Sequence, residues 1–190
     1  MGNKKSHIDP TILTEEIVDL LVANTTFSKD EVRSWHTGFV KDCPKGKLDK
    51  KKFREVYQSL KCGGNVEKFC DLTFKAFDTD NNGTIDFYEF MLALAATQQG
   101  NTKDRLSAAF DIYDIDKNGV IDLKEMIKVF TAVYELNGIQ DKKGEKSPKR
   151  KAELILNRMD KSGKKRLTKS DFIKSCLEDE DLKTIFAPYA

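Results

Sequence analysis

Residues 78–89 read DTDNNGTIDFYE, and residues 114–125 read DIDKNGVIDLKE. Both stretches fit the pattern D-x-[DN]-x-[DN]-G-x5-E without a mismatch, and this pattern is typical of a calcium-binding loop. Calcium takes about six to eight oxygen ligands, and a tight loop can direct alternate side chains at one centre. One match could be an acidic surface turn, but two complete matches in one chain predict two calcium sites.

Each loop is expected to supply oxygen ligands from alternate positions. A glycine at the sixth position permits the sharp turn, because a residue with a Cβ resists that backbone conformation. Position 7 contributes its backbone carbonyl, and the last position contributes a glutamate that binds through both oxygens. The expected ligands are Asp78, Asp80, Asn82, Thr84, Asp86 and Glu89 in the first of these loops, and Asp114, Asp116, Asn118, Val120, Asp122 and Glu125 in the second.

Apolar residues at helical spacing surround both loops. Phe74 and Phe77 precede residues 78–89, and Phe110 and Tyr113 stand at the same positions before the next loop. Apolar residues at similar spacing follow each loop, as expected for an amphipathic helix. The sequence therefore predicts two helix–loop–helix units, which are EF-hands.

Two further copies of the loop lack most of the ligands. Residues 41–52 keep the spacing of the glycine and the aliphatic residue but carry lysines where carboxylates are needed. This loop becomes one residue longer if the incoming helix ends at Phe39. Residues 160–171 place Lys164 at a ligand position and Lys165 where the turn needs glycine. We expect neither loop to bind calcium.

EF-hands work in pairs, and position 8 of each loop forms a short strand against its partner. We therefore expect Leu48 to face Ile85, and Ile121 to face Leu167. A loop without ligands can still build the pair in this way. The predicted fold is all-α, with four EF-hands in two lobes and very short antiparallel strand pairs between the loops.

Glycine and polar residues indicate the boundaries of the lobes. The stretch QQGN at residues 98–101 predicts a hinge at Gly100, between an N-terminal lobe of residues 1–100 and a C-terminal lobe of residues 101–190. A polar, glycine-containing stretch at about residues 138–147 predicts a linker before the fourth EF-hand.

Capping residues mark the starts of several helices. Ser28 with Glu31 predicts a capping box. Ser147 before a proline predicts the N-cap of the fourth incoming helix. Asn65 and Thr102 can cap the incoming helices of the second and third EF-hands.

The composition limits the function further. The chain has 190 residues and a formal net charge of +2, and 39% of it is hydrophobic, which is enough for a packed core. No apolar run is long enough for a transmembrane helix, and the N-terminus lacks the apolar region of a secretory signal. The two histidines, His7 and His36, cannot build a familiar catalytic metal site. We expect a cytoplasmic protein that is not an enzyme and binds no nucleic acid.

These motifs resemble those of the neuronal calcium sensors, in the recoverin/visinin-like branch of EF-hand proteins. The resemblance also rests on MGNKKS at residues 1–6, on Cys43-Pro44 in the first loop and on SPKRKAE at residues 147–153. It covers nearly all of the chain, and recoverin-like proteins similarly use only the middle two loops. It implies a myristoylated calcium sensor that binds membranes and regulates a target such as a receptor kinase, a cyclase or a channel.

The N-terminus supports a lipid anchor. Gly2 and Ser6 meet the pattern M-G-x-x-x-[ST], which predicts N-myristoylation of the glycine. One acyl chain binds a bilayer only marginally, and Lys4 and Lys5 are well placed to add an electrostatic signal. The two intact loops contain eight acidic and two basic residues, a net of −6, so the rest of the chain carries +8. Bound calcium would therefore favour reversible association with anionic membranes.

The resemblance also implies an apolar groove in the N-terminal lobe. Recoverin-like proteins bind an amphipathic target helix there and shelter the acyl chain against the same surface. Here Trp35 and Phe39 lie four residues apart on one helix, and a stripe of apolar residues lies on the next. Some of these residues are expected to belong to the ordinary core. The stripe consists of Phe53, Val56, Tyr57 and Leu60.

Two other functions stay open. A calcium buffer would bind the same ions, but buffers hardly open and have no use for a lipid anchor. A regulatory subunit of a phosphatase, resembling calcineurin B, also begins with a myristoylation signal. Such subunits usually have four working loops, which this chain lacks.

Overall fold

The four loops fold as two pairs, and each pair is built on a two-stranded antiparallel sheet. Leu48 faces Ile85 in one sheet, and Ile121 faces Leu167 in the other, as predicted. All four side chains are buried, so each sheet fixes its two loops to the core of a lobe. The predicted all-α fold with paired EF-hands is confirmed.

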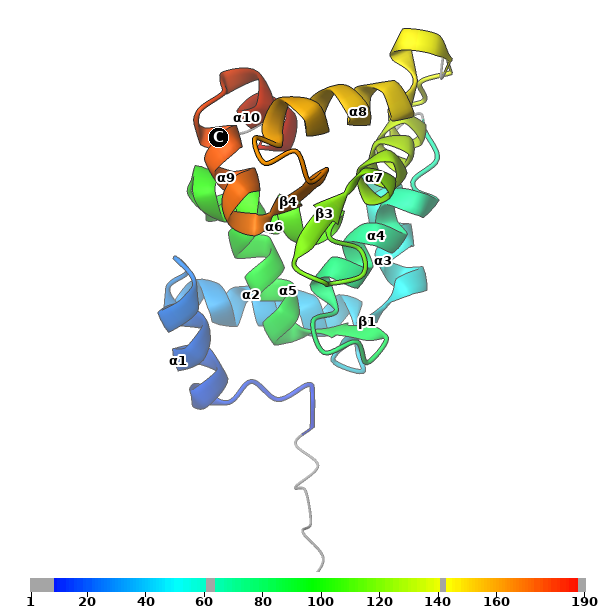
Figure 1. Ribbon diagram of the computed structural model, residues 1–190. Coiled ribbons are helices and arrows are strands. Elements are labelled where there is room, and N and C mark those ends of the chain that lie inside the picture. The colour runs from blue at the N-terminus through cyan, green and yellow to red at the C-terminus, as the bar shows by residue number, and fades with distance from the viewer. Residues whose placement is uncertain (1–8, 61–63, 141–142, 188–190) are drawn as a thin grey trace, which may run out of the picture.

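The computed structural model describes residues 9–60, 64–140 and 143–187 (Figure 1). The N-terminal lobe contains α1 (Glu15–Asn24), α2 (Lys29–Asp42), β1 (Lys47–Asp49), α3 (Lys50–Leu60), α4 (Glu67–Phe77), β2 (Thr84–Asp86) and α5 (Phe87–Leu94). The π-helix η1 (Ala95–Gln99) leads to the second lobe. The C-terminal lobe contains α6 (Thr102–Tyr113), β3 (Val120–Asp122), α7 (Leu123–Leu136), the 3-10 helix η2 (Gly144–Lys146), α8 (Pro148–Met159), β4 (Arg166–Thr168), α9 (Lys169–Leu177) and α10 (Glu180–Phe186).

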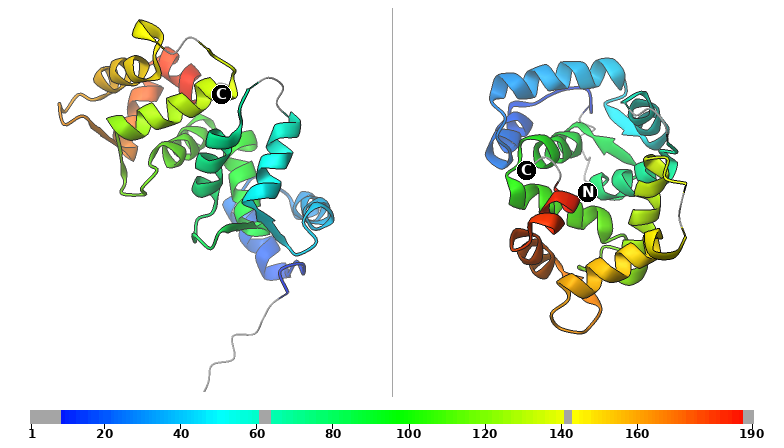
Figure 2. Two further views of the ribbon diagram at one scale, coloured as in Figure 1. Left: turned by 90° about the vertical axis from the view of Figure 1, so that its right-hand side faces the viewer. Right: turned by 90° about the horizontal axis from the view of Figure 1, so that it is seen from above.

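The two lobes share apolar contacts. Leu72 on α4 belongs to the core of the C-terminal lobe. Val66, Cys70 and Leu136 form a small buried cluster that joins α4 to the end of α7. The backbone N–H of Asn65 donates to the Glu135 carbonyl at 2.9 Å next to this cluster. Although α2 and α8 lie at opposite edges of the molecule (Figure 2), the lobes are therefore packed directly together.

Two predicted caps are confirmed, and two helices have their N-cap one residue away from the predicted position. Ser28 and Glu31 form the capping box of α2, and Ser147 caps α8 in front of its proline. The N-cap of α4 is Val66 rather than Asn65, and the Asn65 side chain, one residue earlier, accepts from the Glu67 N–H at 2.9 Å. The N-cap of α6 is Asn101 rather than Thr102, because its amide oxygen accepts from Asp104 in a capping box.

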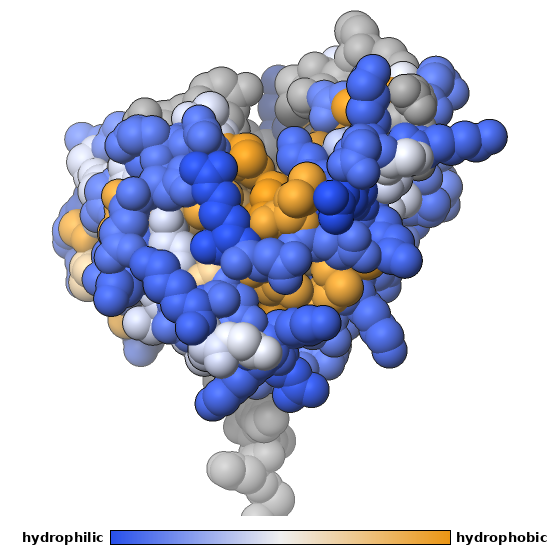
Figure 3. Space-filling model, turned by 45° about the horizontal axis from the view of Figure 1, so that its top comes forward, coloured by the Kyte–Doolittle hydropathy of each residue, from blue (hydrophilic) through white to orange (hydrophobic). Residues whose placement is uncertain are grey.

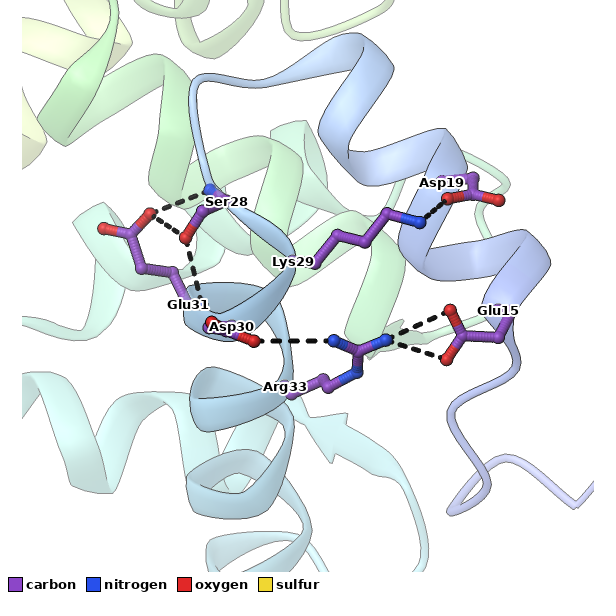
Figure 4. A network of polar contacts seen from close by, with 7 residues as sticks. All are labelled: Glu15, Asp19, Ser28, Lys29, Asp30, Glu31 and Arg33. Atoms are coloured by element: carbon purple, nitrogen blue, oxygen red, sulfur yellow. Dashed lines mark hydrogen bonds and ion pairs between the residues drawn. The ribbon is translucent and has the colours of Figure 1, made fainter.

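Helix α1 was not among the predicted elements. It is tied to α2 by two ion pairs, from Lys29 to Asp19 at 2.5 Å and from Arg33 to Glu15 at 2.9 Å (Figure 4). Val18 and Leu21 of α1 are fully buried in the core of the N-terminal lobe. This helix thus completes the lobe ahead of the first EF-hand.

The register predicted for residues 41–52 is confirmed by the pairing of Leu48 with Ile85, but the incoming helix ends later than either alignment allows. The incoming helix continues through Asp42, so only residues 43–46 separate α2 from β1, whereas residues 78–83 separate α4 from β2. The N–H of Gly46 donates to the Cys43 carbonyl at 2.8 Å and closes a tight turn. No metal has to be surrounded here, so the chain takes the shorter path between helix and strand.

Gly46 is placed where no other residue fits. Its φ is +65°, and a Cβ would lie 2.4 Å from the Pro10 carbonyl oxygen. We expect Gly46→Ala to lower the free energy of unfolding, measured by chemical denaturation, by about 2 kcal/mol or more. Gly163→Ala is the matched control, because Gly163 has φ of +74° with open space around it. An equal loss in both variants would mean that the contact with Pro10 contributes nothing.

Candidate metal centre

The predicted ligands of the loop at residues 78–89 converge on one centre. Asp78 follows the last residue of α4, and Glu89 lies in the first turn of α5. Both are only 6% exposed. Carboxylate oxygens of Asp78, Asp80 and Glu89 lie within 4.8 Å of one another.

The loop at residues 114–125 repeats this arrangement. Carboxylate oxygens of Asp114, Asp116 and Glu125 also lie within 4.8 Å of one another. Asp114 caps the C-terminus of α6, and Glu125 lies in the first turn of α7. Within the described residues, neither of the other two loops holds such a group.

Hydrogen bonds from the loop backbone hold the carboxylates in place. Gly83 donates to Asp78 at 3.0 Å, and its φ of +84° makes the turn that this contact requires. Glu89 accepts from the N–H of Thr79 at 2.8 Å and from the N–H of Asp86 at 3.2 Å. Glu125 makes the equivalent bonds in the next loop. The last ligand of each loop is therefore positioned by the second and the ninth residues of its own loop.

The charges of these sites favour a cation. Burial raises the pKa of Asp86, and the nearby Glu89 carboxylate raises it further. A side-chain hydrogen bond from Asn82 lowers the pKa of Asp80, which keeps that carboxylate ionised. Buried carboxylates that face one another are unfavourable unless a positive charge compensates them.

The donor set fits calcium. Every predicted ligand atom is an oxygen, from carboxylates, a side-chain amide and a backbone carbonyl, as a hard divalent ion requires. In each loop the carboxylates approach from the end of one helix and the start of the next, so a bound ion would join the two helices. Calcium would supply the positive charge that the buried carboxylates lack.

The fourth loop keeps this shape without the ligands. Asp160 accepts from the N–H groups of Ser162, Gly163 and Lys165, at distances of 2.9, 3.1 and 2.6 Å. Lys165 adopts φ of +53° at the position where the intact loops have glycine. Asp171, at the last position, accepts from the Thr168 hydroxyl at 2.7 Å. The loop thus holds itself together through its own hydrogen bonds.

A ligand of the second EF-hand is directly connected to an aromatic cluster. Phe90 follows Glu89 in α5, and its ring lies 6.1 Å from Trp35 and 5.2 Å from Phe39. Phe90 is one of the apolar residues expected to follow the loop in the outgoing helix, but its position in this cluster was not predicted. Movement of α5 on metal binding would therefore displace residues of the predicted groove.

The structure divides the predicted groove residues between core and surface. Trp35 and Val56 are 39% and 45% exposed. Phe39 is buried against Phe87 and Phe90, and Phe53 and Tyr57 are partly buried against the cluster between the lobes. The Leu60 side chain, like Gly2, Lys4 and Lys5, lies outside the described residues.

Gly100 lies beside a cavity of about 570 Å³, which is lined by residues of both lobes. Its φ of −62° is ordinary, and a Cβ would lie 2.8 Å from the Cβ of Asp104. Close packing rather than backbone freedom explains the glycine here. Rotation of the lobes about this residue stays a prediction.

Lys117 connects the two intact loops, and Lys75 on α4 connects the second EF-hand to the later loop; spacing alone could not indicate either contact. Lys75 Nζ donates to the Ile115 carbonyl at 2.6 Å. Lys117 Nζ donates to the Asp78 carbonyl at 3.0 Å and to Asn81 Oδ1 at 3.1 Å. The two predicted calcium loops, which belong to different lobes, therefore touch each other.

Comparison with known proteins agrees with this architecture. Family models described as an EF-hand domain pair match residues 44–97 and residues 103–177. Neuronal calcium sensor 1 of Lymnaea stagnalis is 38% identical over 181 residues, covering 94% of this chain and 92% of that protein. Human recoverin is 33% identical over 186 residues, covering 96% and 91%. S-modulin of Aquarana catesbeiana is 32% identical over 186 residues, covering 96% and 90%.

The relatives extend over almost the whole chain, including the two loops without ligands. The family models place one EF-hand pair in each lobe. The chain therefore belongs to the neuronal calcium sensor family of EF-hand proteins.

Proposed function

We propose that this protein is a calcium sensor that binds two calcium ions, through residues 78–89 and 114–125. The observation that carries the proposal is the pair of carboxylate groups, each of which has a buried aspartate at its first position and lies within 4.8 Å at the junction of two helices. Isothermal titration calorimetry of the unmodified protein tests it. Two sites with dissociation constants of roughly 10⁻⁷ to 10⁻⁵ M are expected for a sensor.

The sensor opens an apolar groove for the amphipathic helix of a target protein, such as a kinase, a cyclase or a channel. Trp35 and Val56 already expose apolar surface on α2 and α3. The face in Figure 3 also gathers apolar side chains in a recess between hydrophilic rims. Phe90 contacts Trp35 and directly follows Glu89 in α5, so the exposed surface of α2 is linked to a predicted calcium ligand. Calcium that binds Glu89 would reorient α5 and widen the groove.

A sensor explains these features better than the alternatives. A buffer needs no path from a metal ligand to exposed aromatic side chains. A phosphatase subunit resembling calcineurin B would use four loops, whereas two loops here lack a group of convergent carboxylates within the described residues. A pulldown from native membranes with and without calcium separates these functions. Calcium-dependent capture of a target that is not a phosphatase supports the sensor.

Membrane association is proposed to be reversible and to depend on a lipid anchor at Gly2. No helix in the described part of the chain is long and apolar enough to cross a membrane. The myristoyl group and nearby lysines would hold the protein at anionic lipid, with calcium adding positive charge.

We expect Gly2→Ala to remove most of the calcium-dependent binding to anionic vesicles, because one acyl chain and a basic surface act together. The measurement is sedimentation of protein expressed with an N-myristoyltransferase, with calcium or with a chelator. Ser6→Ala is the matched control, since it leaves the acceptor glycine in place; acylation of that variant is checked by mass spectrometry. Equal binding of acylated protein in both conditions would rule out a switch, although not simple anchoring.

A further inference from the structure

The charges of the C-terminal lobe are unevenly distributed along the chain. Residues 143–174, from the linker to the middle of α9, contain twelve basic and four acidic residues, a net of +8. The whole chain carries +2, so the remaining residues carry −6. Positive charge is therefore concentrated on α8, the fourth loop and the start of α9.

Part of this charge is compensated within the protein, and part is not. Lys161 and Lys169 form ion pairs with carboxylates at 3.0 and 2.8 Å. Lys164, Lys165 and Arg166 are exposed and form no ion pair with any described residue. Three adjacent cations at the tip of the fourth loop are thus available to an external anion.

The loop presents these cations in a defined conformation. The three N–H bonds to Asp160 fix the turn from its first residue to Lys165. Arg166 begins β4 and is held by the pairing of that strand with β3. Because the loop needs no metal to keep this shape, less order is lost when a partner binds.

The cations also lie beside a predicted calcium site. Arg166 is directly opposite Asp122 in the β3–β4 register, and Asp122 is an expected ligand at residues 114–125. Both residues flank the buried pair of Ile121 and Leu167, so their side chains lie on the same side of the sheet. Without calcium, the acidic loop attracts Arg166 and repels an approaching anion. A bound ion would neutralise part of that loop and raise the positive potential around the three cations.

The position of the loop favours a protein partner over the bilayer. The described chain starts at Asp9, and Pro10 packs against Gly46 of the first loop. An anchor at Gly2 would therefore leave from the N-terminal lobe, near β1. The fourth loop, between α8 and β4, lies in the other lobe, on the opposite side of the molecule from the first EF-hand in both views of Figure 2. A bilayer that holds the anchor and the first loop leaves the fourth loop free.

We propose that Lys164, Lys165 and Arg166 form a calcium-dependent docking site for an acidic segment of a partner protein. This site rests on the proposed function, because its calcium dependence requires an ion at residues 114–125. It is separate from the apolar groove, which belongs to the N-terminal lobe. A target with an acidic stretch beside its amphipathic helix would contact both surfaces.

The experiment measures binding of a fluorescent polyglutamate peptide of about eight residues to the full-length protein, by anisotropy with and without calcium. We expect the triple variant Lys164→Gln, Lys165→Asn, Arg166→Gln to bind the peptide about tenfold more weakly in calcium, as for the loss of three exposed charge pairs. Asparagine is used at residue 165 because it tolerates the left-handed conformation. Peptide binding by the unmodified protein is expected to weaken about tenfold without calcium.

A matched control removes the same charge from the first loop. The variant Lys45→Gln, Lys47→Gln, Lys51→Gln changes three exposed lysines and is expected to keep peptide binding. Binding of both triple variants to phosphatidylserine vesicles is measured in parallel, and only the first-loop variant is expected to weaken it.

The possible outcomes are distinct. Equal loss of peptide binding in both triple variants would show a response to net charge and would overturn the site. Loss of vesicle binding, but not peptide binding, in the fourth-loop variant would assign the surface to the membrane and overturn it too. Peptide binding that ignores calcium, while calorimetry finds both calcium sites filled, would overturn the docking switch and leave the sensor intact. No calcium binding by calorimetry would overturn the sensor itself, and the calcium dependence of docking with it.

Discussion

Glu125→Gln is expected to abolish calcium binding at residues 114–125 and to spare residues 78–89, and Glu89→Gln is expected to do the reverse. Glu125 accepts from the N–H of Ile115 through Oε1 at 2.9 Å and from the N–H of Asp122 through Oε2 at 3.0 Å. Glutamine keeps the volume of the side chain and one oxygen, which can accept one of these two bonds. It removes the second ligand oxygen and a negative charge. The affinity of the altered loop should fall by about 100-fold or more, because calcium affinity follows the number and charge of the ligands.

Isothermal titration calorimetry detects this as the loss of one of two sites in each variant. Asp171→Asn is the matched control, since Asp171 holds the same position in the fourth loop, where its carboxylate accepts from Thr168. It should leave the calorimetric titration unchanged. Retention of both sites in either glutamine variant, or four sites in the unmodified protein, would contradict the assignment of ligands.

Phe39→Ala should destabilise the protein strongly, and Trp35→Ala should weaken target binding while the fold is kept. Phe39 is 6% exposed and packs against Phe87 and Phe90, with ring centroids 5.5 and 5.2 Å away. Removing such a ring typically costs about 3–5 kcal/mol of unfolding free energy.

Trp35 is 39% exposed, so more of its contact area is left for a partner. Its loss should cost target binding about 2 kcal/mol or more, as for an aromatic hot spot.

Denaturant unfolding and a calcium-dependent target pulldown of the same variants measure the two effects. Trp35→Ala should keep both calcium sites, because no loop ligand is changed. Ile185→Ala is the control, since Ile185 is similarly exposed but lies on α10 of the other lobe. Unchanged target binding in Trp35→Ala would place the groove elsewhere, most plausibly in the lobe of Phe130 and Val133.

The parts of the fold that a metal requires were predictable from the sequence. Calcium needs particular oxygens at particular positions, so the spacing from Asp78 to Glu89 fixed the loop and the start of α5 together. The same requirement placed Ile85 opposite Leu48, even though the first loop has lost its ligands. Regular side-chain chemistry at fixed spacing is what sequence patterns describe best.

For the first loop the predicted register was right, but the predicted end of the incoming helix was wrong, because no metal fixes that end. Without ligands, the length of the loop depends on how far α2 continues and on the packing of Gly46 against Pro10. Both are tertiary effects, and the neighbouring residues in the sequence do not encode them. Helix α1 does have a local signal, since Thr14 caps it and Val18 and Leu21 follow at helical spacing. The EF-hand pattern does not include this helix, because it precedes the first helix–loop–helix unit.

The candidate groove shows a similar limit. The apolar stripe on α3 predicted a shared face but could not tell a core residue from a surface one. The contacts across the lobes decided this, because Phe53 and Tyr57 pack against the cluster that contains Leu136 of α7. Phe90 joined the cluster through the geometry of α5, which no spacing within α2 or α3 could indicate.

The lysine contacts between the intact loops bear on how the protein reads a calcium signal. Lys117 of one loop donates to the Asp78 carbonyl of the other, and Lys75 on α4, the helix that leads into the loop of Asp78, donates to the Ile115 carbonyl. An ion that shifts either loop must disturb bonds that belong to both. Thermodynamic linkage then requires the first ion to change the affinity for the second by the same factor, whichever loop is filled first. If the coupling is positive, the two sites would fill over a narrower range of calcium concentration. The contacts at the junction of the lobes would then determine the calcium concentration at which the protein responds.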